Sequence, residues 1–313
     1  MRIFLLAALL MPVLVLAQQY PSKPVRVIVA IAPGSPTDLV MRAAAAELAR
    51  PLGQVITIEN RPGGDMVIGT EACARSAPDG YSYCVISNSA VSINPHIFIK
   101  LPYDPDKDLK PVTALYYLTQ GMITSLPVNS VGELKALALA KPGSLNLGTL
   151  GAGGADMHRL WLNDTWKTDI VGVPYKGANL VMLAMIGGEI QMSLTNVAGL
   201  APHLKSGKMK LLAVGASKRL RQFPEVPIYN EQGLEGFPRT WWGLFGPVAT
   251  PDAAVRRINA EFARLFSDAK FAAYLEGEFL ESAVSSPEQF AVMLRDERER
   301  SGQMVRKYKI PKQ

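Results

Sequence analysis

The sequence predicts an α/β protein of two lobes, each with a mainly parallel sheet flanked by helices. Short apolar runs rich in β-branched residues alternate with helical segments, and this alternation occurs in two separate parts of the chain. The length of 313 residues also suits two domains of ordinary size. Right-handed crossovers would bring the loops that follow the strands to one edge of each sheet.

The first α/β unit begins with a strand over 25–31, whose nearly continuous apolar run suits a strand covered on both faces. Gly34 permits a sharp turn after it, and Ser35 followed by Pro36 has the pattern of a helix N-cap and first helical residue. The Ala-rich stretch that follows predicts a helix to about residue 50. The rest of the unit is predicted as strands over 55–59 and 81–87 and a helix over 66–75.

The second unit repeats this order. Its strands are expected over 144–149, 170–174, 190–194 and 210–215, and its helices over 155–166, 178–186 and 197–206. After the second unit, Val255, Ile258, Phe262 and Leu265 recur at helical spacing, so we expect amphipathic helix over 251–308.

The N-terminus has the pattern of a secretory signal peptide over residues 1–17. Arg2 precedes an apolar run that ends at the small residue Ala17, and this run is shorter than the ~20 residues of a membrane span. We therefore expect cleavage before Gln18 and a soluble, periplasmic protein. The formal charge of the whole chain is 33 − 27 = +6.

The two cysteines, Cys73 and Cys84, lie on a predicted helix and on the strand that follows it. Two such elements pack together, and an oxidising compartment favours pairing. The sequence therefore predicts a disulfide between them.

No catalytic or cofactor motif is complete. The glycine-rich segment at 151–154 has Asp156 where a dinucleotide-binding loop needs its third glycine, and the segment 80–84 lacks the last glycine of a nucleophile elbow. None of the three histidines has a partner at metal-ligand spacing. Basic residues are scattered or mixed with acids, as over 295–300, which argues against nucleic acid. We expect no enzyme, cofactor or metal.

Four loops follow predicted strands and contain small or polar residues. In open parallel sheets, ligands bind beyond these strand ends, where free backbone N–H groups favour anions. If the loops face each other across the two lobes, they form a ligand cleft; the alternative is that their glycines only make turns. The loops are Gly34-Ser35, Ser87–Ser89, Gly151–Gly154 and Thr195-Asn196.

A family resemblance extends over nearly the whole chain. The motifs that carry it, in order, are 20–26 (YPSKPVR) with Pro33-Gly34 and Asp38, 59–63 (ENRPG), 68–69 (IG), 78–81 (PDGY), 94–95 (NP), 101–105 (LPYDP), 173–177 (VPYKG) and 242–245 (WGLF). Together they resemble the receptors of tripartite tricarboxylate transporters, the Bug-type periplasmic solute-binding proteins.

The resemblance implies a type II-like periplasmic binding protein that closes on a small carboxylate like a Venus flytrap. It implies one lobe from residues 18–119 with 237–313, another from 120–236, and a tripartite membrane permease as the partner of a monomeric receptor. A receptor that docks on a membrane sensor without transport is the alternative. The expected ligand-binding residues are Gly34, Ser35, Asp38, Ser87, Ser89, Thr149, Gly153, Gly154, Asp156, His158, Lys176, Thr195 and Asn196.

Departures from the family pattern bear on the solute. Asp65 and Asp156 introduce carboxylates into loops that carry none in the family pattern, so the solute could bear an amine or hydroxyl beside its carboxylate. Asp156 could instead cap its own helix. Lys176 could pair with an anionic ligand or be solvated.

Overall fold

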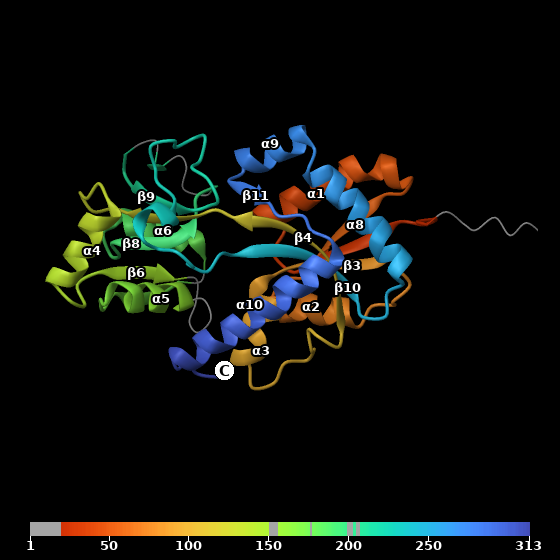
Figure 1. Cartoon of the computed structure of the whole chain (residues 1–313), viewed down its shortest axis with the longest axis horizontal. Helices are drawn as coiled ribbons and strands as arrows, with labels where there is room; N and C mark the ends of the chain where they lie inside the picture. The colour runs from red at the N-terminus through yellow and green to blue at the C-terminus, as the bar shows by residue number, and fades with distance from the viewer. Residues whose placement is uncertain (1–19, 150–155, 176, 199–202, 205–206) are drawn as a thin grey trace, which may run out of the picture.

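The computed structural model describes residues 20–149, 156–175, 177–198, 203–204 and 207–313, and its strands form two sheets flanked by helices (Figure 1). The six-stranded sheet has the order β11-β4-β10-β3-β1-β2, and the five-stranded sheet the order β7-β6-β8-β5-β9. The strands of the first sheet are β1 (Val25–Val29), β2 (Ile56–Asn60), β3 (Ser82–Ser87), β4 (Leu109–Leu118), β10 (Trp241–Pro247) and β11 (Leu280–Ser282). Those of the second are β5 (Gln120–Thr124), β6 (Asn146–Thr149), β7 (Val171–Pro174), β8 (Met192–Asn196) and β9 (Lys210–Gly215).

The helices include the predicted ones and several that the sequence analysis did not assign. They are α1 (Pro36–Leu52), α2 (Val67–Ala74), α3 (Asn94–Ile97), α4 (Val131–Ala140), α5 (Met157–Trp166), α6 (Ala178–Ile186), α8 (Asp252–Phe266), α9 (Ala269–Gly277) and α10 (Pro287–Lys307), with a π-helical turn η1 (Ser89–Ile93) and a 3₁₀ turn η4 (Tyr229–Gln232). Ser35 caps α1 with Pro36 in the first turn, as predicted. The predicted helix over 197–206 lies largely outside the described residues, as does the predicted signal peptide.

The two-lobed α/β prediction is confirmed, and strand direction within each sheet is mainly uniform. In the first sheet β1, β2, β3 and β4 point one way, while β10 and β11 oppose them. In the second, β5 opposes β6, β7, β8 and β9. β5 and β10 are each the first strand that the chain forms after it passes from one sheet to the other. The alternation of strands and helices in the sequence does not predict that these two strands are antiparallel to their neighbours.

The chain crosses between the sheets at two neighbouring points. Only Thr119 separates β4 in the first sheet from β5 in the second. The return segment reaches β10 through Thr240, whose carbonyl accepts a hydrogen bond of 2.9 Å from the Leu118 amide. Since β4 and β10 also pair as strands, the two crossings are held side by side (Figure 1).

The prediction of amphipathic helix over 251–308 is confirmed for most of the segment, but it misses a strand and two breaks. The segment contains α8, α9 and α10, with β11 pairing to β4 between the last two. The breaks have local causes: Asp268 accepts hydrogen bonds from the first amides of α9, and Ser286 caps α10 with Pro287 next to it. Helical spacing in α8 alone carried the prediction.

The predicted disulfide is confirmed. It joins Cys73 of α2 to Cys84 of β3, with their Cα atoms 5.8 Å apart and both residues buried. The bond fixes α2 against the sheet next to the loop that contains Asp65. Over the ranges described, no helix combines the length and apolar character that a membrane span requires.

Removing the disulfide should lower the free energy of unfolding by about 2–4 kcal/mol, because a short loop of the unfolded chain is no longer closed. The measurement is thermal unfolding with and without a thiol reductant. The double variant Cys73→Ala/Cys84→Ala should melt lower than the parent and be insensitive to the reductant. Equal melting of oxidised parent and double variant would contradict this.

Candidate functional site

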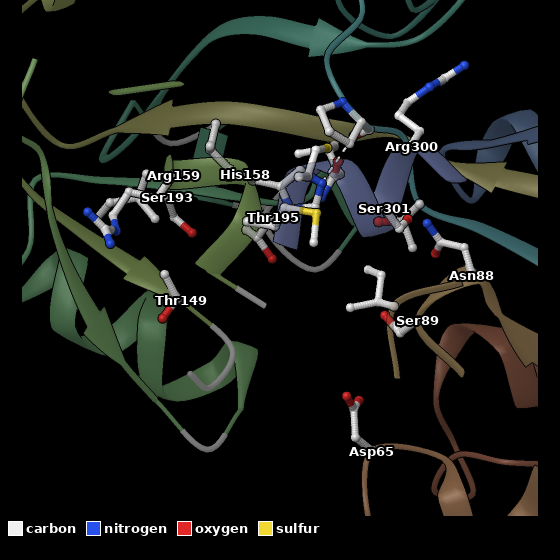
Figure 2. A pocket seen from close by; sticks show the side chains of 18 of the residues that line it. Asp65, Asn88, Ser89, Thr149, His158, Arg159, Ser193, Thr195, Arg300 and Ser301 are labelled. Carbon is white, nitrogen blue, oxygen red and sulfur yellow. Dashed lines mark hydrogen bonds between the residues drawn. The ribbon is translucent and has the colours of Figure 1, made fainter. Parts of the chain in front are cut away.

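A cavity of about 230 Å³ opens between the two sheets and is lined from both (Figure 2). Thr149 at the end of β6, with Ser193 and Thr195 of β8, lies on one wall, while Asn88 and Ser89 after β3 lie on the opposite wall. Of the predicted ligand-binding residues, Ser89, Thr149, His158 and Thr195 are brought together here.

A second cavity of about 430 Å³ adjoins the first, because both are lined by Gln120, Leu194, Thr195 and Thr240. The predicted residue Asn196 lines this second cavity, together with Pro36 and Thr37 from the start of α1. The two cavities are therefore neighbouring parts of one cleft between the lobes, which we call the polar half and the apolar half.

Three predicted residues of the loop after β1 and the first turn of α1 line neither cavity. Their contacts stabilise the fold instead. Gly34 adopts φ 76°, a conformation that favours glycine, and its amide donates to Asp38 at 2.9 Å. Ser35 accepts from the Asp38 amide at the start of α1. The buried Asp38 carboxylate also accepts from Arg42 and Asn60, at 3.0 and 2.9 Å.

These contacts decide the charge of Asp38. Burial alone would raise the pKa of its carboxyl, but the hydrogen bonds from Arg42, Gly34 and Asn60 outweigh burial and lower the pKa. Asp38 is thus an ionised anchor that ties the loop after β1 to α1 and β2. Ser87 is likewise internal: it is buried, and its hydroxyl accepts from the Ser89 amide at 3.2 Å.

Asp156 is engaged by its own helix. Its carboxylate pairs with the guanidinium of Arg159, one contact being 2.7 Å long, and makes no side-chain cap to the α5 amides. Arg159 lines the polar half, while Asp156 does not. The remaining predicted residues, Gly153, Gly154 and Lys176, lie outside the described residues.

His158 is a neutral group of the polar half. Its Nε2 lies 3.1 Å from the Pro238 carbonyl and its ring stacks on Phe237. A carbonyl only accepts, so this contact assigns the proton to Nε2 and leaves Nδ1 as an acceptor. Although the ring is partly exposed to the cavity, desolvation by the surrounding protein lowers its pKa to about 4, against the raising effect of the Pro238 hydrogen bond.

Asp65, an exposed residue, lines the polar half together with Glu297 and points its carboxylate into the cavity (Figure 2). It precedes α2 at φ 52°, and Asn94 fixes its carbonyl through a hydrogen bond of 3.0 Å. Among the described residues, no hydrogen bond or ion pair to its carboxylate is found, and partial desolvation raises its pKa. A group in this position can accept from a ligand amine or hydroxyl, or donate once protonated.

Several residues that line the cavity were not predicted from the sequence. Gln120 and Thr240 flank the crossings, and the apolar runs 112–118 and 241–245 were a usable signal for the strands beside them. Glu297, Arg300 and Ser301 come from α10, whose mixed charges over 295–300 resemble a solvated helix face. Burial raises the pKa of the Glu297 carboxyl, although Asn88 donates to it at 3.4 Å.

Within the described ranges, no group of three or more His, Cys, Asp and Glu residues could hold a metal ion.

Comparison with known proteins gives concordant matches. The profile of the family described as tripartite tricarboxylate transporter family receptor matches residues 40–310. Protein BugT of Bordetella pertussis is 29% identical over 296 residues, covering 93% of this chain and 90% of BugT. The structure of MatC from Rhodopseudomonas palustris with bound malate matches with a TM-score of 0.74 at 30% identity, covering 91% of this chain and 100% of that one. An R. palustris protein with adipate matches with a TM-score of 0.82 at 25% identity, covering 94% and 100%.

The neutral state of His158 should make stability depend on pH. Its pKa is about 4 in the folded protein and 6.5 ordinarily, so its share of stability is complete above 6.5 and is lost as pH falls toward 4. The loss amounts to at most about 3 kcal/mol. Denaturant unfolding from pH 7 to 4 should show a shallower decline in His158→Gln, whose amide keeps a donor and does not titrate. An imidazole titration near 6.5 by NMR would contradict the assignment.

Proposed function

Because this chain belongs to the tripartite tricarboxylate transporter receptor family, as its Bug-type motifs predicted, we propose that it captures a small organic acid and delivers it to a tripartite permease. As a member of this family it is a solute-binding protein and not an enzyme. The observation that carries the proposal is the polar half of the cleft, where Ser89 faces Thr149 and Thr195 from the other sheet (Figure 2).

An acid in the polar half is recognised by neutral donors. Ser89, Thr149 and Thr195 supply hydroxyls, and Gln120 and Asn88 lie nearby. Arg159 is already paired with Asp156, and the Arg300 guanidinium lies 3.9 Å from the Glu297 carboxylate. We further propose that backbone amides of Gly153 and Gly154, and the ammonium of Lys176, complete the binding of the carboxylate.

Binding closes two lobes about the crossings. We propose the lobes as residues 18–119 with 237–313, and residues 120–236. The distribution of strands supports these boundaries, because every strand before Thr119 or after Thr240 belongs to one sheet and those between belong to the other. Hinges of this kind are a few residues that absorb the change in backbone angle.

The compartment follows from the N-terminus. We propose that residues 1–17 direct export and are removed, so that the receptor acts in the periplasm. The disulfide between Cys73 and Cys84 supports this, since such bonds persist in oxidising compartments.

If the receptor delivers its solute to a permease, uptake of the solute by cells should require both this chain and the permease. Solute-dependent docking on a sensor without uptake would contradict delivery.

The acid-binding proposal predicts that an organic acid raises the melting temperature. Native mass spectrometry of gently purified protein should identify a retained acid, and that acid at 100 times its Kd should stabilise the fold by about 2.7 kcal/mol. Thr195→Val, which removes one hydroxyl from the cleft, should weaken binding by roughly tenfold. Thr165→Val on the exposed face of α5 is the matched control and should bind like the parent. If no carboxylate in a broad panel shifts the melting curve, the proposal fails.

The proposed solute bears an amine or hydroxyl that meets Asp65, since the other candidate, Asp156, is occupied by Arg159. Asp65→Asn should weaken binding of such a solute by about 10- to 100-fold, because a hydrogen bond to a charged acceptor is lost. Acids without that donor should bind as before or more tightly. Asp296→Asn, which makes the same charge change at an exposed site on α10, should change neither. Calorimetric titration measures both effects, and unchanged affinity for every solute would contradict the role of Asp65.

A further inference from the structure

The two halves of the cleft differ in charge. The polar half is lined by Asp65, Arg159, Glu297 and Arg300, whereas none of the described residues that line the apolar half is charged. This asymmetry bears on the ligand, because a carboxylate is better satisfied where polar and charged groups gather than against a mainly hydrocarbon wall.

Both lobes contribute large hydrophobic side chains to the apolar half, which also contains neutral polar residues such as Thr37 and Asn179. Leu118 and Trp242 come from the first sheet and Ile31 from the segment that follows β1. Val181, Met182 and Met185 come from α6 beside the second sheet. Methionine side chains adapt to irregular shapes, and a volume of about 430 Å³ is within the ordinary range of small-molecule sites. This space suits the hydrocarbon part of a ligand.

The two halves are close enough for one molecule to occupy both. Leu194 and Thr195 of β8 line both cavities, and so do Gln120 and Thr240 at the crossings. A ligand whose acid group is held at Thr195 and Ser89 can therefore extend past Leu194 towards Met182 and Trp242. A second carboxylate at the far end of that body would meet a mainly hydrocarbon wall, on which Thr37, Asn179 and Asn196 are neutral polar side chains.

We propose that the solute is a monocarboxylate with a sizeable apolar body, which fills the apolar half while its acid group occupies the polar half. This inference rests on the proposed acid-binding function and narrows its substrate class. It sets this receptor apart from dicarboxylate binding, the chemistry of the adipate- and malate-bound structures to which the chain is similar.

The test compares hexanoate, 3-phenylpropionate and adipate by calorimetric titration of the full mature chain. Hexanoate and adipate share their chain length and differ in the second carboxylate. We expect at least one of the two monocarboxylates to bind at least tenfold more tightly than adipate. Tighter binding of adipate, or binding of neither monocarboxylate, would overturn the inference. Either result would leave the acid-binding proposal standing, because that proposal is decided by the broad carboxylate panel.

A positive charge placed in the apolar half should reverse the preference for monocarboxylates over adipate. Met182→Lys supplies a partner for a far carboxylate, so it should tighten adipate and weaken the two monocarboxylates by tenfold or more. Leu180→Lys adds the same charge to the exposed side of α6 outside both linings and should alter neither. Unchanged affinities in a folded Met182→Lys protein would overturn the inference, and the parent's own preference decides the matter if that variant does not fold.

Discussion

The cleft depends on one constraint: the chain passes between its two sheets at adjacent points. The Leu118 amide donates to the Thr240 carbonyl across the crossings, and the Thr119 amide donates to the Phe279 carbonyl at 3.1 Å. The first bond joins the two crossings, and the second ties the first crossing to the segment before β11. Gln120, the first residue of β5, and Thr240, which directly precedes β10, line both halves of the cleft. A ligand seated there lies against the same segments that relate one lobe to the other.

Ion pairing within the fold explains why neutral groups are left to recognise an acid. Of the two arginines that line the polar half, Arg159 is paired with Asp156, and the Arg300 guanidinium lies 3.9 Å from the Glu297 carboxylate. Desolvation keeps the imidazole of His158 uncharged. Fixed hydroxyls, amides and backbone N–H groups bind an anion without requiring a buried countercharge, which would itself carry a desolvation cost. The net charge of +6 over 313 residues adds only weak long-range attraction.

Local physical chemistry made much of this fold predictable, and long-range packing accounts for the rest. The strand within 25–31, the Ser35-Pro36 cap and the Cys73–Cys84 pair each follow from short-range rules. The structure confirms the cap and the pair, and it has the strand over Val25–Val29. The ends of β3, β6 and β8 bring Ser89, Thr149 and Thr195 together as parallel-sheet geometry implies. By contrast, the roles of Asp38 and Asp156 depended on which guanidinium each would meet. The contribution of α10 depended on how a distant helix packs, which no local pattern records.

A solute shifts the receptor towards a closed arrangement only if it binds that arrangement better than the open one. A molecule that touched a single wall would have equal affinity for both arrangements and would shift nothing. An acid between Ser89 and Thr195 satisfies the requirement by hydrogen bonds, since these groups come from opposite sheets. An apolar body between Trp242 and Met182 satisfies it a second time, by removing hydrocarbon surface of both lobes from water. In the proposed closure, the two halves of the cleft thus act on the same hinge, and a solute that fills only one of them gives up part of the free energy that would favour the closed receptor.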